Sequence, residues 1–438
     1  MLNVLLPFAM MTLALSLALQ PELRLAVPLL VGVTAAMTML LACLLYLGEK
    51  GRIALSWQVI ITGALAMRLL FLFAPPQLSD DLYRYLWDAL NLLNGINPYA
   101  AAPAVVTPPP ELTALHSQIN HPQYVTIYPP AAQLLFAGGA ALGGTLTGLK
   151  GLLVALDLGL CALLVVMLKR LELPLWRAAL YAWHPLPLLE IAASGHVDGT
   201  GMALVMASFA LLAAAGAGKG GGWRVPAAGG LLAAAGLVKL FPVALVPPVL
   251  AAVPRQRRWL FVAGGLAGVL LLVVPFLPSI AAILGSLDSY ARHWEFSGFA
   301  FRTLRAATGS GTIARLVLIG LFLGVVGGST FRLFRRLRTA GSPAERLRAT
   351  LTACYGVALA FLLLTPTLHP WYALCLAALL PFSAGPAGLT LCWSVFLAYQ
   401  VQLSYFIEGN WQERAWVAAA VFGAPVAAWL LGRMTPRR

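Results

Sequence analysis

Long apolar segments recur from one end of this chain of 438 residues to the other, as in 1–20, 225–253 and 260–276. Because the hydrocarbon core of a bilayer is about 30 Å thick, a helix needs about 20 apolar residues to cross it. Charged residues make up only 10% of the chain, whereas they make up roughly a quarter of soluble domains. The sequence therefore predicts an all-α, polytopic transmembrane bundle, because a membrane β-barrel would alternate in short segments instead.

The apolar segments predict about 12–14 spans, with boundaries good to a few residues. The expected spans are 3–20, 25–48, 54–74, 127–147, 151–168, 177–193, 198–218, 226–251, 259–278, 311–330, 349–367, 371–388, 389–407 and 414–432. They suggest an N-terminal hairpin over 1–53, a core over 54–310 and C-terminal helices over 311–438. The first segment lacks a basic start and a small-residue cleavage site, so we expect it to be a retained span.

The formal net charge of +14 comes largely from basic loops between spans, such as 254–258 and 331–348, and from the basic tail. Cytoplasmic loops of membrane proteins carry such an excess of Lys and Arg, so this pattern favours a membrane protein over a nucleic-acid partner. We therefore expect a multi-pass membrane protein with both termini in the cytoplasm. The expected external regions are 75–126, 279–310, 368–372 and 407–414.

Two basic loops, 169–177 and 219–224, come out external in this count. This conflicts with the charge rule, so we expect one short segment between 127 and 218 to be re-entrant or broken. The cysteines lie in apolar segments without paired spacing, which indicates small buried residues and neither a metal site nor a disulfide framework. They are Cys43, Cys161, Cys354, Cys375 and Cys392.

The first external region contains "LSDDLYRYLWDALNLLNGINPYAAAP", which holds three of the six aspartates of the chain. Its apolar residues recur at helical spacing and Asn94-Gly95 ends the run, so we expect an amphipathic helix along the membrane surface. Ser79, Asp80 and Asp81 stand at its start, where they would cap the helix. A carboxylate pair at the lipid–water boundary could equally deprotonate a hydroxyl, and the two roles are compatible.

The other external segments carry cations and aromatic side chains. Residues 290–305 bring Arg292, His293, Arg302 and Arg305, and arginine suits phosphate because it offers a planar fork of donors. The "LHPWY" turn brings His369, Trp371 and Tyr372, which suit either a sugar face or the membrane interface. Ordinary loop solvation stays an alternative for the two arginines Arg302 and Arg305.

Ionisable residues also lie within or beside the apolar segments, where they are costly and usually functional or paired. Glu190, His196 and Asp198 fall in "WHPLPLLEIAASGHVDG", and Lys239 falls in "GLVKLFP". Structural pairing or snorkelling stays open for Lys239, and His196 and Asp198 could serve structure or substrate. The spacing offers too few ligands to argue a metal site.

The segments "SDDLYRYLWDALNLLNGINPYAAAP", "TIYPPAAQLLF", "WHPLPLLEIAASGHVDG", "GLVKLFP" and "LTPTLHPWY" occur in this order. Together they resemble the GT-C superfamily of integral-membrane glycosyltransferases over about residues 54–410, and most closely bacterial polyprenol-phosphate-sugar-dependent mannosyltransferases. The resemblance implies a polyprenyl-phosphate sugar donor, a lipid or glycan acceptor and inverted stereochemistry. It also implies a place in the bacterial inner membrane and an aspartate in the first external loop that acts as general base on the periplasmic side. No cofactor is required by the resemblance, and a divalent metal is left open.

Carried over residue by residue, the resemblance makes Asp81 the base and Asp80 its alternative or supporting acid. The sequence departs from the family pattern at the N-terminus, where two apolar segments precede the expected catalytic loop. The expected substrate-binding residues are Arg84, Tyr85, Tyr128, His196, Asp198, Lys239, Arg302, Arg305, His369, Trp371 and Tyr372.

The main rival prediction is a transporter or flippase for lipid-linked sugars. It would also need an amphiphile-sized cavity with basic contacts for the head group. It predicts important charges in both halves of the membrane, whereas the polar residues singled out above gather on the external side. An O-antigen ligase or polymerase would carry its large external loop late in the chain, so we rank it lower. The enzyme is therefore our first hypothesis.

Overall fold

The computed structural model describes residues 2–216 and 221–434, and every regular element in these ranges is a helix. The basic loop 219–224 and the basic tail lie partly outside the described residues. The longer helices are α1 (Leu2–Ala18), α2 (Val27–Glu49), α3 (Trp57–Leu72), α4 (Asp81–Leu93), α6 (Pro130–Ala140), α7 (Leu146–Arg170), α10 (Asp198–Gly216), α11 (Arg224–Val238), α13 (Arg258–Val273), α14 (Ile280–His293), α15 (Phe299–Thr308), α16 (Gly311–Leu337), α17 (Pro343–Leu364), α20 (Pro386–Ser394), α21 (Gln400–Glu408) and α22 (Ala415–Met434). The shorter α-helices are α5 (Thr113–His116), α8 (Ala179–Ala182), α9 (Pro185–Pro187), α12 (Val246–Ala252), α18 (Leu374–Ala377) and α19 (Leu380–Ser383).

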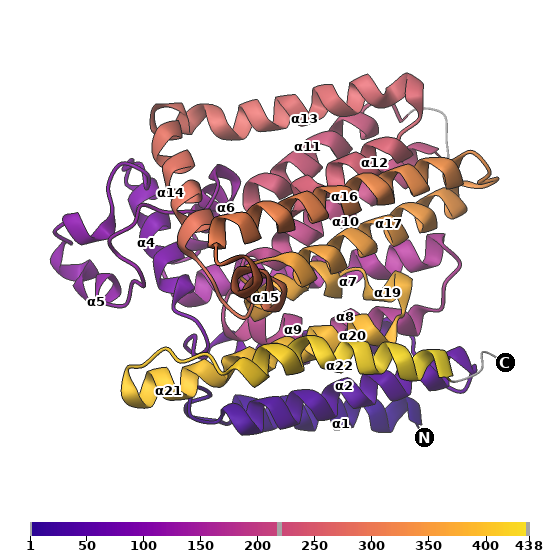
Figure 1. Cartoon of the computed structure of the whole chain (residues 1–438), viewed down its shortest axis with the longest axis horizontal. Helices are drawn as coiled ribbons and strands as arrows, with labels where there is room; N and C mark the ends of the chain where they lie inside the picture. The colour runs from indigo at the N-terminus through magenta and orange to yellow at the C-terminus, as the bar shows by residue number, and fades with distance from the viewer. Residues whose placement is uncertain (1, 217–220, 435–438) are drawn as a thin grey trace.

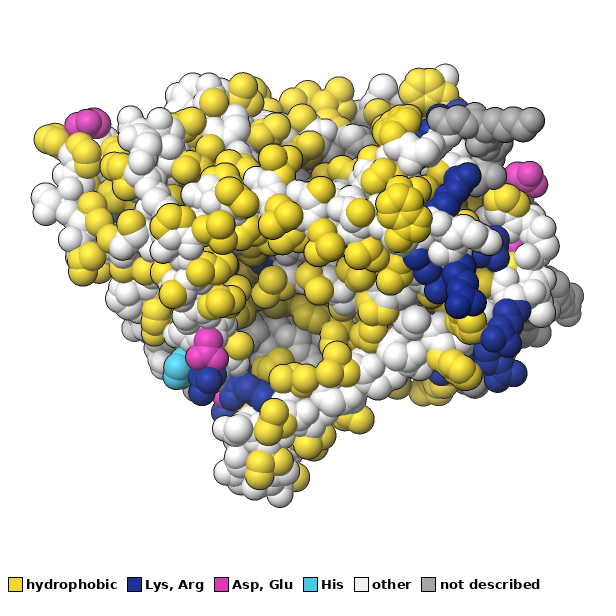
Figure 2. All heavy atoms as spheres, turned by 90° about the horizontal axis from the view of Figure 1, so that it is seen from above, with side chains coloured by type: hydrophobic (Ala, Val, Ile, Leu, Met, Phe, Trp, Pro, Cys, Tyr) yellow, Lys and Arg dark blue, Asp and Glu magenta, His cyan; other side chains and the backbone are white. Residues whose placement is uncertain are grey.

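The helical bundle is confirmed in the described part of the chain. Seven of its helical segments are long and apolar enough to cross a membrane, which suggests a multi-pass membrane protein. The long helices run along one common direction (Figure 1), with α4, α5, α14 and α21 at one end of the bundle. Helix α1 begins and α22 ends at the opposite end. Figure 2 shows a largely hydrophobic face on which most Lys and Arg gather at that opposite end. We call the end with α4 the α4 end and the other the basic end.

Helix α7 runs antiparallel to α3, as two contacts near its ends show. At its start, the Lys150 ammonium lies 2.7 Å from the carbonyl oxygens of both Phe71 and Ala74, where α3 finishes. At its other end, Lys169 lies over the ring of Trp57, the first residue of α3. Helix α7 therefore starts at the α4 end and finishes at the basic end.

The predicted span 127–147 is therefore wrong, because α7 starts on the side where this segment begins. Helix α6 packs against α4 and the chain turns back into α7 at the same end. Hydropathy alone suggested a crossing, but α6 has only 11 residues and is too short for one. This correction also moves the basic loop 169–177 to the basic end, so its charge no longer conflicts with the positive-inside pattern.

Helices α11 and α12 form a hairpin whose two ends lie together. Arg224 and Arg257, which flank the hairpin, both donate to carbonyls near the end of α10, at 3.0 Å from Ala214 and 3.4 Å from Ala215. Lys239 follows α11 at the tip of the hairpin, where Pro242 prevents a continuous helix. The predicted single span 226–251 is thus wrong, and a hairpin of two shorter apolar helical segments takes its place.

A broken segment returns the chain from α7 to the α4 end. It consists of η3 (Leu175–Ala178), α8, α9 and the π-helix η4 (Leu188–Ala193), and α9 begins at Pro185 and ends at Pro187. Arg177 near its start pairs with Glu49 at the end of α2. Such irregular backbone is tolerated at membrane depth where protein surrounds it, and the residues of η4 are all buried.

A buried ion pair joins this broken segment to α3 and α7. The Arg68 Nε of α3 lies 2.5 Å from Asp157 Oδ2 of α7, and both side chains are almost fully buried. Arg68 Nη1 also donates to the Ala182 carbonyl (2.7 Å), and the Tyr181 hydroxyl donates to Asp157 Oδ1 (2.5 Å). Each charge therefore has several partners, which a buried ion pair needs to offset its desolvation.

One buried apolar cluster contains side chains from all three regions of the predicted division, including Met10, Ala64, Leu160 and Cys392. Helix α1 packs on α3, and α2 packs on α20. Four of the five cysteines are buried as predicted, whereas Cys43 is exposed on the outer side of α2. The division itself stays a prediction.

The path of α6 predicts a labelling pattern. Cysteines introduced as Glu111→Cys and Leu142→Cys should react with a membrane-impermeant maleimide from the same side, and Glu172→Cys from the opposite side. All three residues are exposed; Glu111, next to α5, and Leu142, before α7, lie at the α4 end, whereas Glu172 follows α7 at the basic end. The background should carry Cys43→Ser, since the other native cysteines are buried. Labelling of Leu142→Cys from the side opposite to Glu111→Cys would contradict this path.

Candidate active site

Asp81 is the first residue of α4 and its carboxylate is held from two sides. The Tyr128 hydroxyl donates to Asp81 Oδ2 (2.9 Å), and the Asn120 amide donates to Oδ1 (2.8 Å). His196 Nδ1 lies 3.8 Å from the same Oδ2. The Asp81 side chain is 19% exposed, so the carboxylate is anchored and still reachable.

The two acids at the start of α4 point to different partners. Asp80 occupies the N-cap position, but its side chain makes no capping hydrogen bond. Its carboxylate pairs instead with Arg24 at 2.7 Å. The Ser79 hydroxyl accepts the Asp81 N–H at 3.2 Å, so the predicted cap comes from the serine and the predicted cap role of Asp80 is wrong.

Two tyrosines support the Asp81 carboxylate as hydrogen-bond donors. The Tyr85 hydroxyl donates to the Tyr128 hydroxyl (3.1 Å), and the Tyr85 ring stacks on Phe136 of α6 with ring centroids 4.1 Å apart. Burial, reinforced by the nearby Asp81 charge, raises the pKa of both tyrosines well above its ordinary value. Both phenols therefore keep their protons, and the chain Tyr85–Tyr128–Asp81 has a fixed direction.

Arg84, expected at the substrate, lies instead in a network between α4 and the loop before α6. Its Nε pairs with Asp88 Oδ1 at 2.9 Å, and its Nη1 donates to the Tyr124 carbonyl at 3.1 Å. Gln133 of α6 donates to Asp88 Oδ2 at 3.2 Å. Burial raises the pKa of Asp88, although Arg84 acts in the opposite direction. This network fixes α4 against α6.

Four aromatic rings from three parts of the chain form a stack beside Asp81, which we call the ring stack. His196 stacks on Trp371 with centroids 3.8 Å apart, Trp371 on His369 at 4.3 Å, and His369 on Phe296 at 4.8 Å. Backbone bridges between Phe296 and Thr367 hold the outer part of the stack together.

His196 lies between two carboxylates. Its Nε2 is 3.6 Å from Glu190 Oε2, and the Tyr399 hydroxyl lies 2.9 and 3.0 Å from the two oxygens of Glu190. Within the described part of the chain, neither ring nitrogen of His196 has a hydrogen-bond partner, although the ring is fully buried. The imidazole is therefore placed beside Asp81 with unused hydrogen-bonding capacity.

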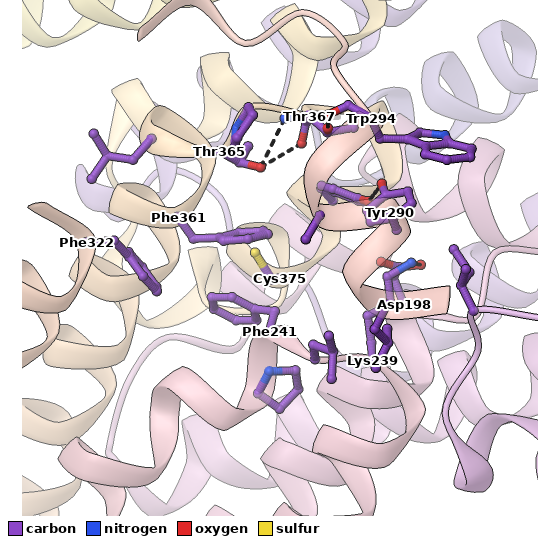
Figure 3. Close-up of a pocket in the computed structure, with 18 of the residues that line it drawn as sticks. Asp198, Lys239, Phe241, Tyr290, Trp294, Phe322, Phe361, Thr365, Thr367 and Cys375 are labelled. Carbon is purple, nitrogen blue, oxygen red and sulfur yellow. Dashed lines mark hydrogen bonds and ion pairs between the residues drawn. The ribbon is translucent and has the colours of Figure 1, made fainter. Parts of the chain in front are cut away.

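A cavity of about 370 Å³ lies between α14, α16, α17 and the tip of the α11–α12 hairpin (Figure 3), and Tyr128 belongs to its wall. Its wall is mainly apolar, from side chains such as Phe322 and Phe361. Leu240 and Ile319 of the wall are more than half exposed, at 52% and 54%, so the cavity opens to the surroundings of the bundle. An apolar molecule would suit this lining.

Three charged side chains belong to the cavity wall: Asp198, Lys239 and Arg315. The Lys239 ammonium lies 3.2 Å from Asp198 Oδ2 and over the rings of Tyr372 (5.1 Å) and Tyr128 (5.8 Å). Tyr128 thus forms part of the cavity wall and donates to Asp81, and it connects the cavity with the carboxylate.

The two external arginines expected at the phosphate have acidic partners. Arg302 pairs with Glu413, and Arg305 pairs with Glu295. Neither belongs to the cavity wall formed by the described residues, whereas Arg315, which pairs with Glu295 at 3.1 Å, does. Sequence reasoning missed Arg315, although an arginine inside an apolar run is the signal that singled out Lys239.

Sequence reasoning also missed Asn120, Tyr290 and Trp294. Tyr290 and Trp294 belong to the cavity wall, and the Tyr290 hydroxyl shares a hydrogen bond with Tyr372. Asn120 gives no sequence signal, because it lies in an irregular loop among many polar residues. Within the described residues, no group of three His, Cys, Asp or Glu side chains is arranged to hold a metal ion.

Comparisons with protein-family models, with curated proteins and with solved structures gave no match.

Gly195 is predicted to be essential for the approach of α4. Its φ is +79°, and a Cβ there would lie 2.6 Å from Leu82 Cδ1. Gly195→Ala should therefore lower the stability of the folded protein in detergent by about 1–3 kcal/mol, measured by thermal unfolding. Gly151→Ala is the control, since an added Cβ meets nothing within 4 Å there. A Gly195→Ala protein as stable as the control would contradict this account.

His369 should make stability depend on pH. Burial lowers its pKa from 6.5 to about 3, so it stays neutral in the fold while an unfolded chain would protonate it. The neutral ring therefore makes its full contribution to the free energy of unfolding above about pH 6.5, and this contribution is lost as the pH falls toward 3. His369→Gln should reduce the loss of stability between pH 7 and 4.5 by about 1–3 kcal/mol, allowing for partial exposure.

The exposed His293 provides the matched control, because His293→Gln should leave the acid loss unchanged. The melting temperature of each detergent-solubilised variant at the two pH values gives the comparison. If His369→Gln loses as much stability as the unmodified protein, the ring is not held neutral in the fold.

Proposed function

We propose that the protein is a membrane glycosyltransferase that moves a sugar from a polyprenyl-phosphate donor to an acceptor hydroxyl on the extracytoplasmic side. The proposal depends most on one observation. An anchored, reachable carboxylate, Asp81, is connected through Tyr128 to an apolar cavity that has a cation, Lys239, on its wall. This arrangement offers a base, a place for a lipid chain and a counter-charge for phosphate within one site.

In the proposed reaction the isoprenoid chain lies in the cavity and its sugar phosphate lies toward Tyr128. The acceptor oxygen attacks the anomeric carbon from the face opposite the phosphate, and Asp81 takes the hydroxyl proton. The bond between the anomeric carbon and the phosphate oxygen breaks, and the electron pair leaves on the lipid phosphate. The product has inverted stereochemistry at the anomeric carbon.

The cations on the cavity wall support the departure of the phosphate. Lys239 and Arg315, which also pair with Asp198 and Glu295, lie in the cavity wall and would stabilise the charge that develops on the leaving group, since preorganised cations act strongly in an apolar site. His369 is neutral, so it would act as a hydrogen-bond donor and not as a cation. Mannose as the sugar follows from the family resemblance only.

The placement of the site also supports the proposal. The α4 end lies opposite the basic end, which the positive-inside rule assigns to the cytoplasm. A donor whose lipid enters from the bilayer could reach the cavity past Leu240 and Ile319. A flippase would need charged groups along a path to both ends, whereas Asp81, Asp198 and Lys239 lie together near one end.

The direct test is transfer of labelled mannose from polyprenyl-phosphate mannose by the purified protein in liposomes. Asp81→Asn should lower kcat by at least about 100-fold, because proton transfer by a positioned base contributes roughly that much. Tyr128→Phe should retain measurable activity, because it removes one hydrogen bond to the base and leaves the base in place. Full activity in Asp81→Asn would remove Asp81 from the role of base.

The same liposomes separate the enzyme from its rival. Movement of the lipid-linked sugar across the bilayer without any glycosidic product would support a flippase and contradict the proposal. Asp80→Asn should retain most of the transfer activity, whereas an active protein with both Asp80 and Asp81 replaced by Asn would exclude this site altogether.

A further inference from the structure

The turn between α1 and α2 is bonded to the segment that leads into α4. The Leu23 N–H donates to Gln77 Oε1 (2.7 Å), and Gln77 Nε2 donates to the Pro21 carbonyl (3.1 Å). Arg24 Nε donates to the Gln77 carbonyl, and its Nη2 lies 2.7 Å from Asp80 Oδ1. The N-terminal hairpin therefore holds the last residues before the candidate base.

Arg24 is partly buried at this contact, with its side chain 20% exposed. The guanidinium also lies over the ring of Phe406 at 6.0 Å. From the same helix α21, Gln402 donates to the Leu78 carbonyl (3.2 Å). A guanidinium with a carboxylate, a carbonyl and a ring as partners is better fixed than a simple surface ion pair.

The contact with Arg24 gives Asp80 and Asp81 different partners. The Asp80 carboxylate turns to Arg24, while the Asp81 carboxylate turns to Tyr128 and Asn120. An unpaired charge on Asp80 would raise the proton affinity of its neighbour, because two close like charges oppose each other's ionisation. Arg24 offsets that charge.

We propose that Arg24 is a positioning residue that neutralises Asp80 and fixes the start of α4, so that Asp81 alone serves as the base. The base role of Asp81 rests on the proposed function. The electrostatic link from Arg24 through Asp80 to Asp81 is a property of the chain itself and can be measured without any substrate.

Other titratable groups also face Asp81, and the variants below leave all of them unchanged. Tyr83 is a second titratable neighbour of Asp80, in addition to Arg24. The groups around Asp81 are Tyr85, Tyr128, His196, Asp198, Tyr290, His369, Tyr372 and Tyr399. Differences between the variants therefore report on Arg24 and Asp80.

The test follows protonation of Asp81 by carbodiimide labelling, since a carbodiimide reacts with a protonated carboxyl group and not with a carboxylate. Mass spectrometry of the detergent-solubilised protein gives the pH midpoint of labelling at Asp81. Arg24→Gln should raise this midpoint by about half to one pH unit, because the Asp80 charge loses its partner. Asp80→Asn should lower it, because the Arg24 charge then acts on Asp81 unopposed.

The double variant Arg24→Gln with Asp80→Asn should return the midpoint to that of the unmodified protein. Arg177→Gln is the matched control, because Arg177 and Glu49 form a comparable pair at the opposite end of α2, with 15% and 49% exposure against 20% and 41%. This control should not move the midpoint. A role limited to stability would not produce opposite shifts in the two single variants.

Transfer activity gives a second readout in the same variants. The acid limb of the pH profile of kcat/KM should move in the same directions as the labelling midpoint. Arg24→Lys should keep the limb in place, because the charge remains, while kcat falls several-fold, because the bond from Nε to Gln77 is lost.

The outcomes separate the two proposals. Equal labelling midpoints in Arg24→Gln, Asp80→Asn and the unmodified protein would overturn the role of Arg24, even if the protein transfers sugar. Opposite midpoint shifts in a protein without transferase activity would uphold the electrostatic link and reject the proposed function. If Arg24→Gln does not fold, Asp80→Asn still decides, since an unchanged midpoint in it overturns the proposal.

Discussion

The buried ion pair between Arg68 and Asp157 is the constraint on which the rest of this structure depends. A single charge at that depth would cost several kcal/mol. The pair, the hydrogen bond that Tyr181 donates to Asp157 and the one that the Ala182 carbonyl accepts from Arg68 must therefore form together. They fix α3, α7 and the broken segment at one point. Helix α3 leads directly into Asp80 and Asp81, and the broken segment leads into His196, so both sides of the candidate site start from this contact.

Composition and periodicity predicted much of the fold. The helical bundle, the helix from Asp81 and its end at Asn94 followed from apolar spacing and from turn residues. The paths of α6 and of the α11–α12 hairpin did not, because hydropathy measures how apolar a segment is and not where it goes. The two basic loops that violated the charge rule carried the missing information, and the structure places 169–177 with the other basic loops.

The cations at the α4 end show why the candidate site was only partly predictable. Sequence reasoning offered the external arginines Arg302 and Arg305 as phosphate ligands, with loop solvation as the alternative. In the described part of the chain, most cations at this end have an acidic partner instead. Several partners are far apart in sequence, so no local pattern could reveal them. The pairs are Arg24 with Asp80, Arg84 with Asp88, Lys239 with Asp198, Arg292 with Asp288, Arg302 with Glu413, and Arg305 and Arg315 with Glu295.

The ring stack of Phe296, His369, Trp371 and His196 has a mechanical consequence. Its successive rings lie nearly parallel, at 26°, 4° and 18° to one another, and they come from three separate parts of the chain. Stacked faces resist being pulled apart, because the opened gap would forfeit their contacts and would have to be filled. The stack therefore opposes separation of the outer segment and the "HPWY" turn from His196, and it sets the spacing of these three parts of the chain.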